Sequence, residues 1–284
     1  MALKRYRALF GSFLLLAPTL GGAELKYPQE VALWQEVSIP LVLNRSEREV
    51  RFFAANRSRH QWRVFMAHGQ VCARLTSGEP PQRDLPPFAP KPVRLAAYGA
   101  FANATSFARV ADGWLIGYNQ GEFGGALHWY SRDGRRHYKI SDHQIVDFFR
   151  LPTGWHAVEG MEHRHTSQGS VIRLVQTPPN ARWRAVTIVR LPSAPYAASV
   201  CRDGSMLVTL SNSLVQVEAW GGITTLFADT PWGRLYPGSS VLSSDEQKLY
   251  LGMRQFVGEF DLSTKKLRLL VPSSPFLNLP GERD

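Results

Sequence analysis

The feature that most constrains this chain is a pattern of four short strands that recurs along it. Residues 199–227 read "SVCRDGSMLVTLSNSLVQVEAWGGITTLF", in which apolar runs alternate with turn signals and no helix-length periodicity appears. Each copy has a short apolar segment, a two-residue turn, a strand, a variable polar loop, a strand, a turn and a final strand. The opening segments are "SFARV" (106–110), "IVDFFRL" (145–151), "YAASV" (196–200) and "SSVLS" (239–243).

The spacing of the copies predicts how the small sheets assemble. Counted at the second strand, Trp114 to Trp155 is 41 residues, Trp155 to Met206 is 51, and Met206 to Leu249 is 43. A period in the forties with four strands per unit is typical of a β-propeller blade. One small sheet cannot bury both faces alone, whereas sheets packed in a ring cover one another. The sequence therefore predicts an all-β β-propeller.

The turns carry a resemblance to known proteins. Asp112-Gly113 and Asp203-Gly204 precede second strands, Thr153-Gly154 is a weaker version, and "FDLSTKKLRLL" (260–270) is a strand-turn-strand unit. In these features residues 106–272 resemble secreted bacterial β-propellers of the YncE-like and NHL-like kind. The resemblance implies a fold, and no catalytic motif comes with it, because such propellers have unrelated activities.

The sequence before the regular repeats follows the four-strand spacing less closely. Four strand-like runs, at 37–44, 48–55, 61–68 and 70–76, are followed by a proline-rich crossing. We interpret residues 24–92 as a divergent first blade followed by this crossing. Together with four regular blades over 104–274, the first blade gives a propeller of five four-stranded blades. A separate small β domain ahead of an incomplete propeller is the alternative.

The first 23 residues have the pattern of an export signal. Lys4, Arg5 and Arg7 precede a short apolar run, and small residues follow it at 21–23. The apolar run is too short to span a membrane, so we expect no transmembrane anchor. Because the segment directs export, we expect a periplasmic or secreted protein. We expect its residues 24–284 to form one domain and the protein to be a monomer. Removal of the segment lowers the formal net charge from +10 to +7.

The composition narrows the partner classes. The basic residues are scattered instead of forming a stripe, so nucleic acid is not an expected partner.

The chain has only two cysteines, Cys72 and Cys201, which fall in blades that are not neighbours, so a disulfide is not expected. The two tryptophans at matching blade positions, Trp114 and Trp155, are expected to pack between blades.

Propeller geometry separates the loops into two rims of different character. The connections between first and second strands, and between third and fourth, are plain turns. The opposite rim carries longer loops at 118–125, 161–169 and 230–238, with a blade-to-blade loop at 141–144, and these are rich in His, Glu, Arg, Trp and Tyr. Because loops on a rigid scaffold carry function, we expect the binding site on this rim.

Three groups on this rim are candidates. In the segment Glu162-His163-Arg164-His165 the two histidines would point the same way if the segment is extended, with His143 and Glu159 as possible neighbours, and two histidines with a carboxylate could bind a metal. A solvated polar loop is the simpler interpretation. Trp232, Arg234 and Tyr236 are residue types enriched at binding hot spots, although Trp232 and Tyr236 could instead fill a blade interface. Carboxylates near the channel mouth could serve a hydrolase or lyase, but nothing fixes their separation.

The function predicted from these features is binding without catalysis. We expect an exported β-propeller that binds a protein or a cell-envelope glycan, one form of which is an immunity protein against a toxin. No catalytic residue, metal or cofactor is assigned. The alternative is a metal-assisted lyase or hydrolase with a His/Glu site at the channel mouth. The predicted binding residues are Tyr118, Glu122, Phe123, His143, Glu162, His163, Arg164, His165, Trp232, Arg234, Tyr236 and Arg254.

Overall fold

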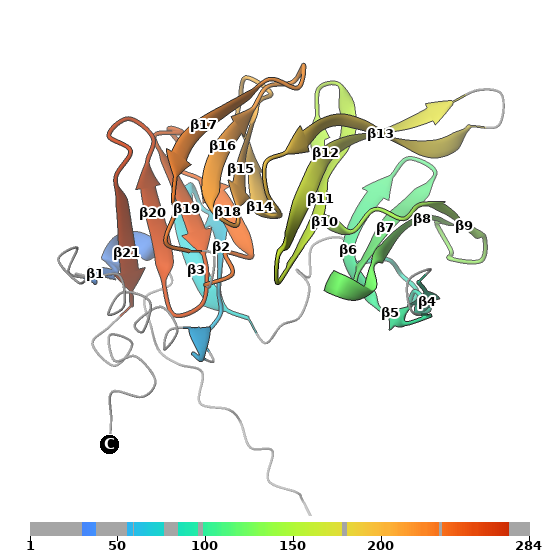
Figure 1. Cartoon of the computed structure of the whole chain (residues 1–284), viewed down its shortest axis with the longest axis horizontal. Coiled ribbons are helices and arrows are strands. Elements are labelled where there is room, and N and C mark those ends of the chain that lie inside the picture. The colour runs from blue at the N-terminus through green and yellow to red at the C-terminus, as the bar shows by residue number, and fades with distance from the viewer. Residues whose placement is uncertain are drawn as a thin grey trace, which may run out of the picture.

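The computed structural model describes residues 30–37, 56–58, 60–76, 85–95, 99–177, 181–232 and 235–272, and these residues form strands and two short 3₁₀ turns (Figure 1). The first elements are η1 (Val31–Leu33), β1 (Gln35–Glu36), β2 (Trp62–Ala67), β3 (Gln70–Leu75), β4 (Val93–Arg94) and β5 (Phe101–Ala102). The predicted export signal, residues 1–23, lies outside the described ranges. Within those ranges, no helix combines the length and the apolar character that crossing a membrane requires.

Four antiparallel sheets follow (Figure 1). Three have four strands in chain order, and the fourth has four consecutive strands with β1 added as a fifth at its edge. The first contains β6 (Ala104–Val110), β7 (Gly113–Asn119), β8 (Gly125–Ser131) and β9 (His137–Ser141), with η2 (Gly121–Phe123) between β7 and β8. The second contains β10 (Ile145–Leu151), β11 (Gly154–His163), β12 (Thr166–Thr177) and β13 (Arg182–Leu191). The third contains β14 (Pro195–Val200), β15 (Met206–Leu210), β16 (Ser213–Val217) and β17 (Ile223–Ala228). The fourth contains β18 (Ser239–Leu242), β19 (Lys248–Gly252), β20 (Val257–Asp261) and β21 (Leu267–Val271). The predicted four-stranded repeat is therefore confirmed.

The core lies between neighbouring sheets, which explains why the middle strands are apolar on both faces. Every residue of β15 is buried, whereas the outer strand β17 has none that is buried. One apolar cluster joins the first sheet to the second through residues such as Leu127 and Ile172. Another joins the second to the third through Val158 and Val208. Each sheet thus covers its neighbour, as the repeat requires.

The structure describes only part of the predicted first blade. Of the four predicted runs, two are the paired strands β2 and β3, and residues 38–55 lie outside the described ranges. The short strand β1 pairs with β21 and extends the fourth sheet, so it does not belong to a sheet with β2. The described residues form four-stranded sheets of the predicted kind, and neither a closed ring nor a fifth four-stranded blade is found among them.

The β2–β3 pair is nevertheless attached to the fourth sheet. The Trp62 amide donates to the Met253 carbonyl at 3.1 Å, and the Val64 amide donates to Ser239 Oγ at 3.0 Å. A single apolar cluster contains Trp62, Val64 and Ala73 together with residues of β19 to β21. Cys72 on β3 and Cys201 after β14 are both unpaired thiols.

Candidate functional site

The first strands of the four sheets, together with β2, surround a cavity of about 260 Å³. Neighbouring members of this set lie side by side, in the order β6, β10, β14, β18 and β2. Each contributes residues from its first half, near the rim where the hairpins β7–β8 and β11–β12 turn. The lining residues are Arg63, Val64, Thr105, Ser106, Phe107, Val146, Asp147, Tyr196, Ala197, Ala198, Gly238, Ser239 and Ser240.

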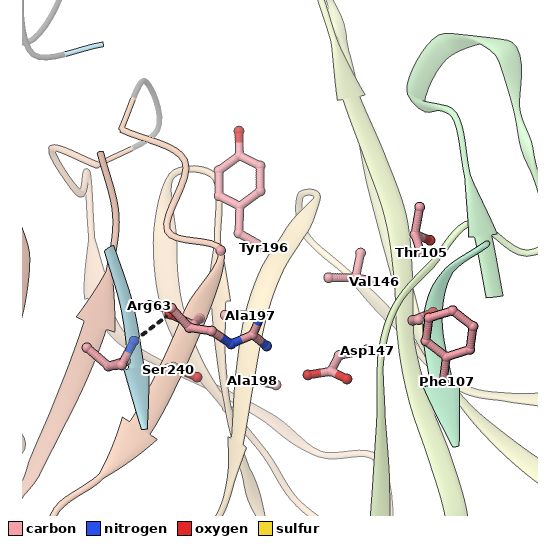
Figure 2. A pocket seen from close by; sticks show the side chains of 13 residues that line it. Arg63, Thr105, Phe107, Val146, Asp147, Tyr196, Ala197, Ala198 and Ser240 are labelled. Carbon is pink, nitrogen blue, oxygen red and sulfur yellow. Dashed lines mark hydrogen bonds between the residues drawn. The ribbon is translucent and has the colours of Figure 1, made fainter. Parts of the chain in front are cut away.

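Two opposite charges face each other inside this cavity. Figure 2 shows Arg63 extending from β2 and Asp147 from β10, with the guanidinium and the carboxylate directed toward one another. Asp147 keeps an exposed surface toward the cavity, yet protein atoms lie around its carboxylate, and the resulting desolvation raises its pKa. The Phe148 amide, which donates to Asp147 Oδ1 at 2.8 Å, and the Arg63 charge both oppose the rise in pKa. The cavity is thus polar and carries compensating charges.

Tyr196 connects the cavity to the rim. It lines the cavity from β14, and its hydroxyl donates to Glu162 Oε2 on β11 at 2.7 Å. Burial, followed by the hydrogen bond to Glu162, raises the pKa of the Tyr196 hydroxyl, so it remains a neutral donor. The Tyr236 ring lies 5.9 Å from the Tyr196 ring, centroid to centroid. The mouth therefore carries two neighbouring phenol rings and a carboxylate.

Arg254 fixes one side of this mouth. Its guanidinium lies 5.0 Å from the centroid of the Tyr236 ring and donates to the Asn56 carbonyl and side-chain oxygens at 2.6 and 2.7 Å. Arg254 is half-buried and occupied by these contacts, whereas Tyr236 is 46% exposed. The predicted binding residue Arg254 therefore positions Tyr236 and leaves the ring to solvent.

The predicted loop at 161–169 is a tight hairpin, which corrects the expected geometry of its histidines. Strand β11 continues to His163, β12 begins at Thr166, and Arg164 has a left-handed φ of 51°. The turn separates His163 from His165, so the two do not alternate along one extended strand. Instead, His163 Nε2 lies 2.7 Å from Glu122 Oε2 on η2, and this pair joins the rims of the first two sheets.

Two predicted contact residues lie in the core. Tyr118 is fully buried in β7, and its hydroxyl is 2.9 Å from that of Tyr130. Trp232 is also fully buried, and its Nε1 donates to the Leu210 carbonyl at 2.9 Å. Trp232 and Tyr236 therefore do not share an exposed face, which agrees with the alternative interpretation that Trp232 fills an interface. The third member of that group, Arg234, lies outside the described residues.

The remaining predicted residues are on or near the rim without forming one cluster. Phe123 is 39% exposed, His165 is exposed at its turn, and His143 Nδ1 lies 2.7 Å from Ser141 Oγ. Among the described residues, no three His, Cys, Asp or Glu side chains come together in a way that could hold a metal ion. The structure thus gathers Glu162 and Tyr236 at the mouth and leaves the histidines dispersed.

Sequence reasoning missed the residues that line the cavity. Asp147 stands in "IVDFFRL" and Arg63 in "QWRVFMAH", and each is a charged residue near the start of a mainly apolar strand. That signal was available, because a charge in a strand facing the interior needs a compensating partner or solvent. Tyr196 gave no comparable signal, since aromatic residues are ordinary in strands.

Comparisons with known proteins give a fold-level likeness. No family model matches the chain, and no curated protein matches it. Among solved structures it is similar to virginiamycin B lyase from Staphylococcus aureus, with 14% identity over 61% of this chain and 57% of that chain, at a TM-score of 0.42. It is also similar to a gluconolactonase from Xanthomonas campestris, with 12% identity over 69% of this chain and 62% of that one, at a TM-score of 0.40. A third is PorZ of Porphyromonas gingivalis, with 11% identity over 76% of this chain and 32% of that chain, at a TM-score of 0.44.

The lyase and the gluconolactonase are β-propeller proteins, in line with the resemblance noted in the repeats. The matched part spans less than two thirds of the length of each. Identities this low concern the fold alone, and TM-scores below 0.5 carry no statement about the site.

Proposed function

We propose that this protein is a non-catalytic binding protein of the cell envelope that engages a macromolecular partner through the rim bearing Glu162, His163 and Tyr236. The partner class is a protein or a glycan. In this proposal the sheet β2–β3 is the remnant of a fifth blade, and residues 1–23 direct export. The protein acts as a monomer in the periplasm or outside the cell.

One observation carries the proposal. The cavity lies among the first halves of five strands, on the side of the same rim that presents the exposed Tyr236 ring and the Glu162 carboxylate. Exposed aromatic rings next to charged groups are typical of binding hot spots. Arg254 and its contacts with Asn56 hold the Tyr236 ring in place, which reduces the ordering cost on binding.

Affinity capture from the native envelope tests this proposal. Tagged mature protein is compared with a Tyr236→Asn variant, since asparagine tolerates the left-handed φ of 49° at this position. The matched control is Trp220→Ala, which removes an 81% exposed aromatic ring at the β16–β17 turn on the opposite rim. We expect the recovered partner to bind the rim variant about tenfold more weakly, as loss of a hot-spot ring predicts.

The same two variants identify the results that would contradict binding through this rim. If Tyr236→Asn captures the partner as well as the wild type while Trp220→Ala loses it, the binding surface is the opposite rim. If neither variant differs from the wild type, the mouth of the cavity has no part in recognition. Thermal unfolding of each variant checks that both are folded.

A further inference from the structure

The cavity offers a more specific site than the rim around it. Its two charged residues stand on opposite walls, Arg63 on β2 and Asp147 on β10, and point toward the same space (Figure 2). A group placed between them must accept a hydrogen bond from the guanidinium and donate one to the carboxylate. A hydroxyl does both at once, because it has one donor hydrogen and two acceptor lone pairs.

The charge of the walls favours an uncharged ligand. Arg63 already compensates Asp147, since its charge opposes the burial-induced rise in the carboxyl pKa. A zwitterion entering between them would lose the hydration of its own ionised groups, a desolvation penalty that neutral hydroxyls largely avoid. The chemistry of the cavity therefore suits a polyhydroxylated, neutral molecule.

The size and the entrance of the cavity narrow the class of ligand further. Its volume of about 260 Å³ is slightly below the usual range of small-molecule sites, about 300–1,000 Å³, so it suits one ring better than a chain. The entrance carries the Tyr196 and Tyr236 rings, whose faces can pack against the apolar face of a saccharide. Gly238, two residues after Tyr236, is itself part of the cavity wall, so rim and cavity are continuous.

We propose that the cavity between Arg63 and Asp147 binds the terminal neutral saccharide unit of a glycan, while the rim contacts the following units. This inference rests on the proposed function and specifies its partner as a glycan. Asp147 accepts hydrogen bonds from ring hydroxyls, and Arg63 donates to the same or adjacent oxygens. Ser239 and Ser240 line the wall beside Arg63.

Ligand-observed NMR with purified protein tests the site directly. The probes are D-glucose, D-galactose, D-mannose and N-acetylglucosamine, with L-alanine as the zwitterionic comparison. Asp147→Asn keeps the oxygen that accepts from the Phe148 amide, and Arg63→Gln changes the opposite wall independently. The matched controls are Asp133→Asn, in the β8–β9 turn of the opposite rim, and Arg190→Gln, which is exposed on the outer strand β13.

We expect at least one saccharide to bind, with affinity reduced about tenfold or more in each cavity variant and unchanged in both controls, because each variant removes a charge-assisted hydrogen bond. Circular dichroism confirms that the variants fold. The inference is overturned if no saccharide binds, if L-alanine binds in their place, or if saccharide binding is unaffected by both cavity variants. If the saccharide site fails in this way while envelope capture still depends on Tyr236, the proposed function stands without this inference. The failure of the saccharide site can therefore be distinguished from the failure of the proposed function.

Discussion

Replacement of Trp62 tests whether β2–β3 belongs to the same cooperative unit as the four regular sheets. Trp62 is 1% exposed, its ring lies edge-on to Trp34 at 4.7 Å between centroids, and its Nε1 donates to the Gln255 carbonyl at 3.1 Å. The hydrogen bond to Gln255 joins the N-terminal pair to the fourth sheet, and the contact with Trp34 joins it to the residue before β1, which pairs with β21 of that sheet. A separate N-terminal domain would share no such core.

The size of the effect follows from burial and the hydrogen bond. Truncation of a buried tryptophan to alanine costs about 3–5 kcal/mol through lost packing and the cavity it leaves. The lost hydrogen bond adds about 1 kcal/mol. We therefore expect Trp62→Ala to lower the free energy of unfolding by about 4–6 kcal/mol, and Trp62→Phe, which keeps an aromatic ring, by about 1–2 kcal/mol.

Chemical denaturation followed by far-UV circular dichroism measures these values. The control is Trp220→Ala, where an 81% exposed ring should change the free energy of unfolding by less than about 0.5 kcal/mol. The wild type and the Trp62→Phe variant should unfold in one transition, because β2–β3 shares an apolar cluster with the third and fourth sheets, and further clusters join these to the remaining sheets. Two separate transitions, with only the smaller shifted by Trp62→Phe, would refute the reasoning and favour a separate N-terminal domain.

Two further predictions concern the sheets themselves. Glu259, 7% exposed, accepts from Tyr250 at 2.8 Å, Lys248 at 3.0 Å and Arg268 at 3.1 Å, and these partners hold its pKa below the usual value although burial raises it. Glu259→Gln should cost about 2–3 kcal/mol at neutral pH, discounted because the two cations are partly exposed. Because the folded pKa is depressed, this difference is fully present above the unfolded pKa of about 4.3 and shrinks as pH falls toward and through the folded value. The free energies of unfolding of wild type and variant should therefore differ less at pH 3 than at pH 7, and an equal difference at both pH values would contradict the prediction. In β7, a Cβ on Gly117 would lie 2.3 Å from Ser106 Oγ and 2.6 Å from Ile145 Cβ, so Gly117→Ala should destabilise by about 1–3 kcal/mol, and a change below about 0.5 kcal/mol would show that β10 can move away.

The local repeat could be predicted from the sequence because its signals are local. Turns such as Asp112-Gly113 and Asp203-Gly204 separate strands whose alternation is written in neighbouring residues, and the structure confirms the four-stranded sheets they imply. The 161–169 segment was predicted less well. A polar composition indicated a loop, but pairing with β12 extends β11 through Glu162 to His163, since cross-strand partners override local propensity.

The site residues were likewise predicted where the signal is local and missed where it depends on how the sheets pack. The sequence indicated which rim carries exposed charged and aromatic groups, and Glu162 and Tyr236 do lie there. It could not distinguish the exposed Tyr236 from the fully buried Trp232, four residues earlier, because both are aromatic residues in one turn-rich segment. Burial depends on which sheet packs over a side chain, and that is a property of the assembled sheets.

By itself, then, the sequence determined the strands, their turns and their order within each sheet, because strand alternation and turn chemistry act over a few residues. Only the tertiary structure decided that Arg63 and Asp147, 84 positions apart in the chain, face one cavity, and that β1 extends the fourth sheet instead of joining β2–β3. These are long-range pairings, whose energy comes from apolar surface and charges that meet only once the sheets have stacked.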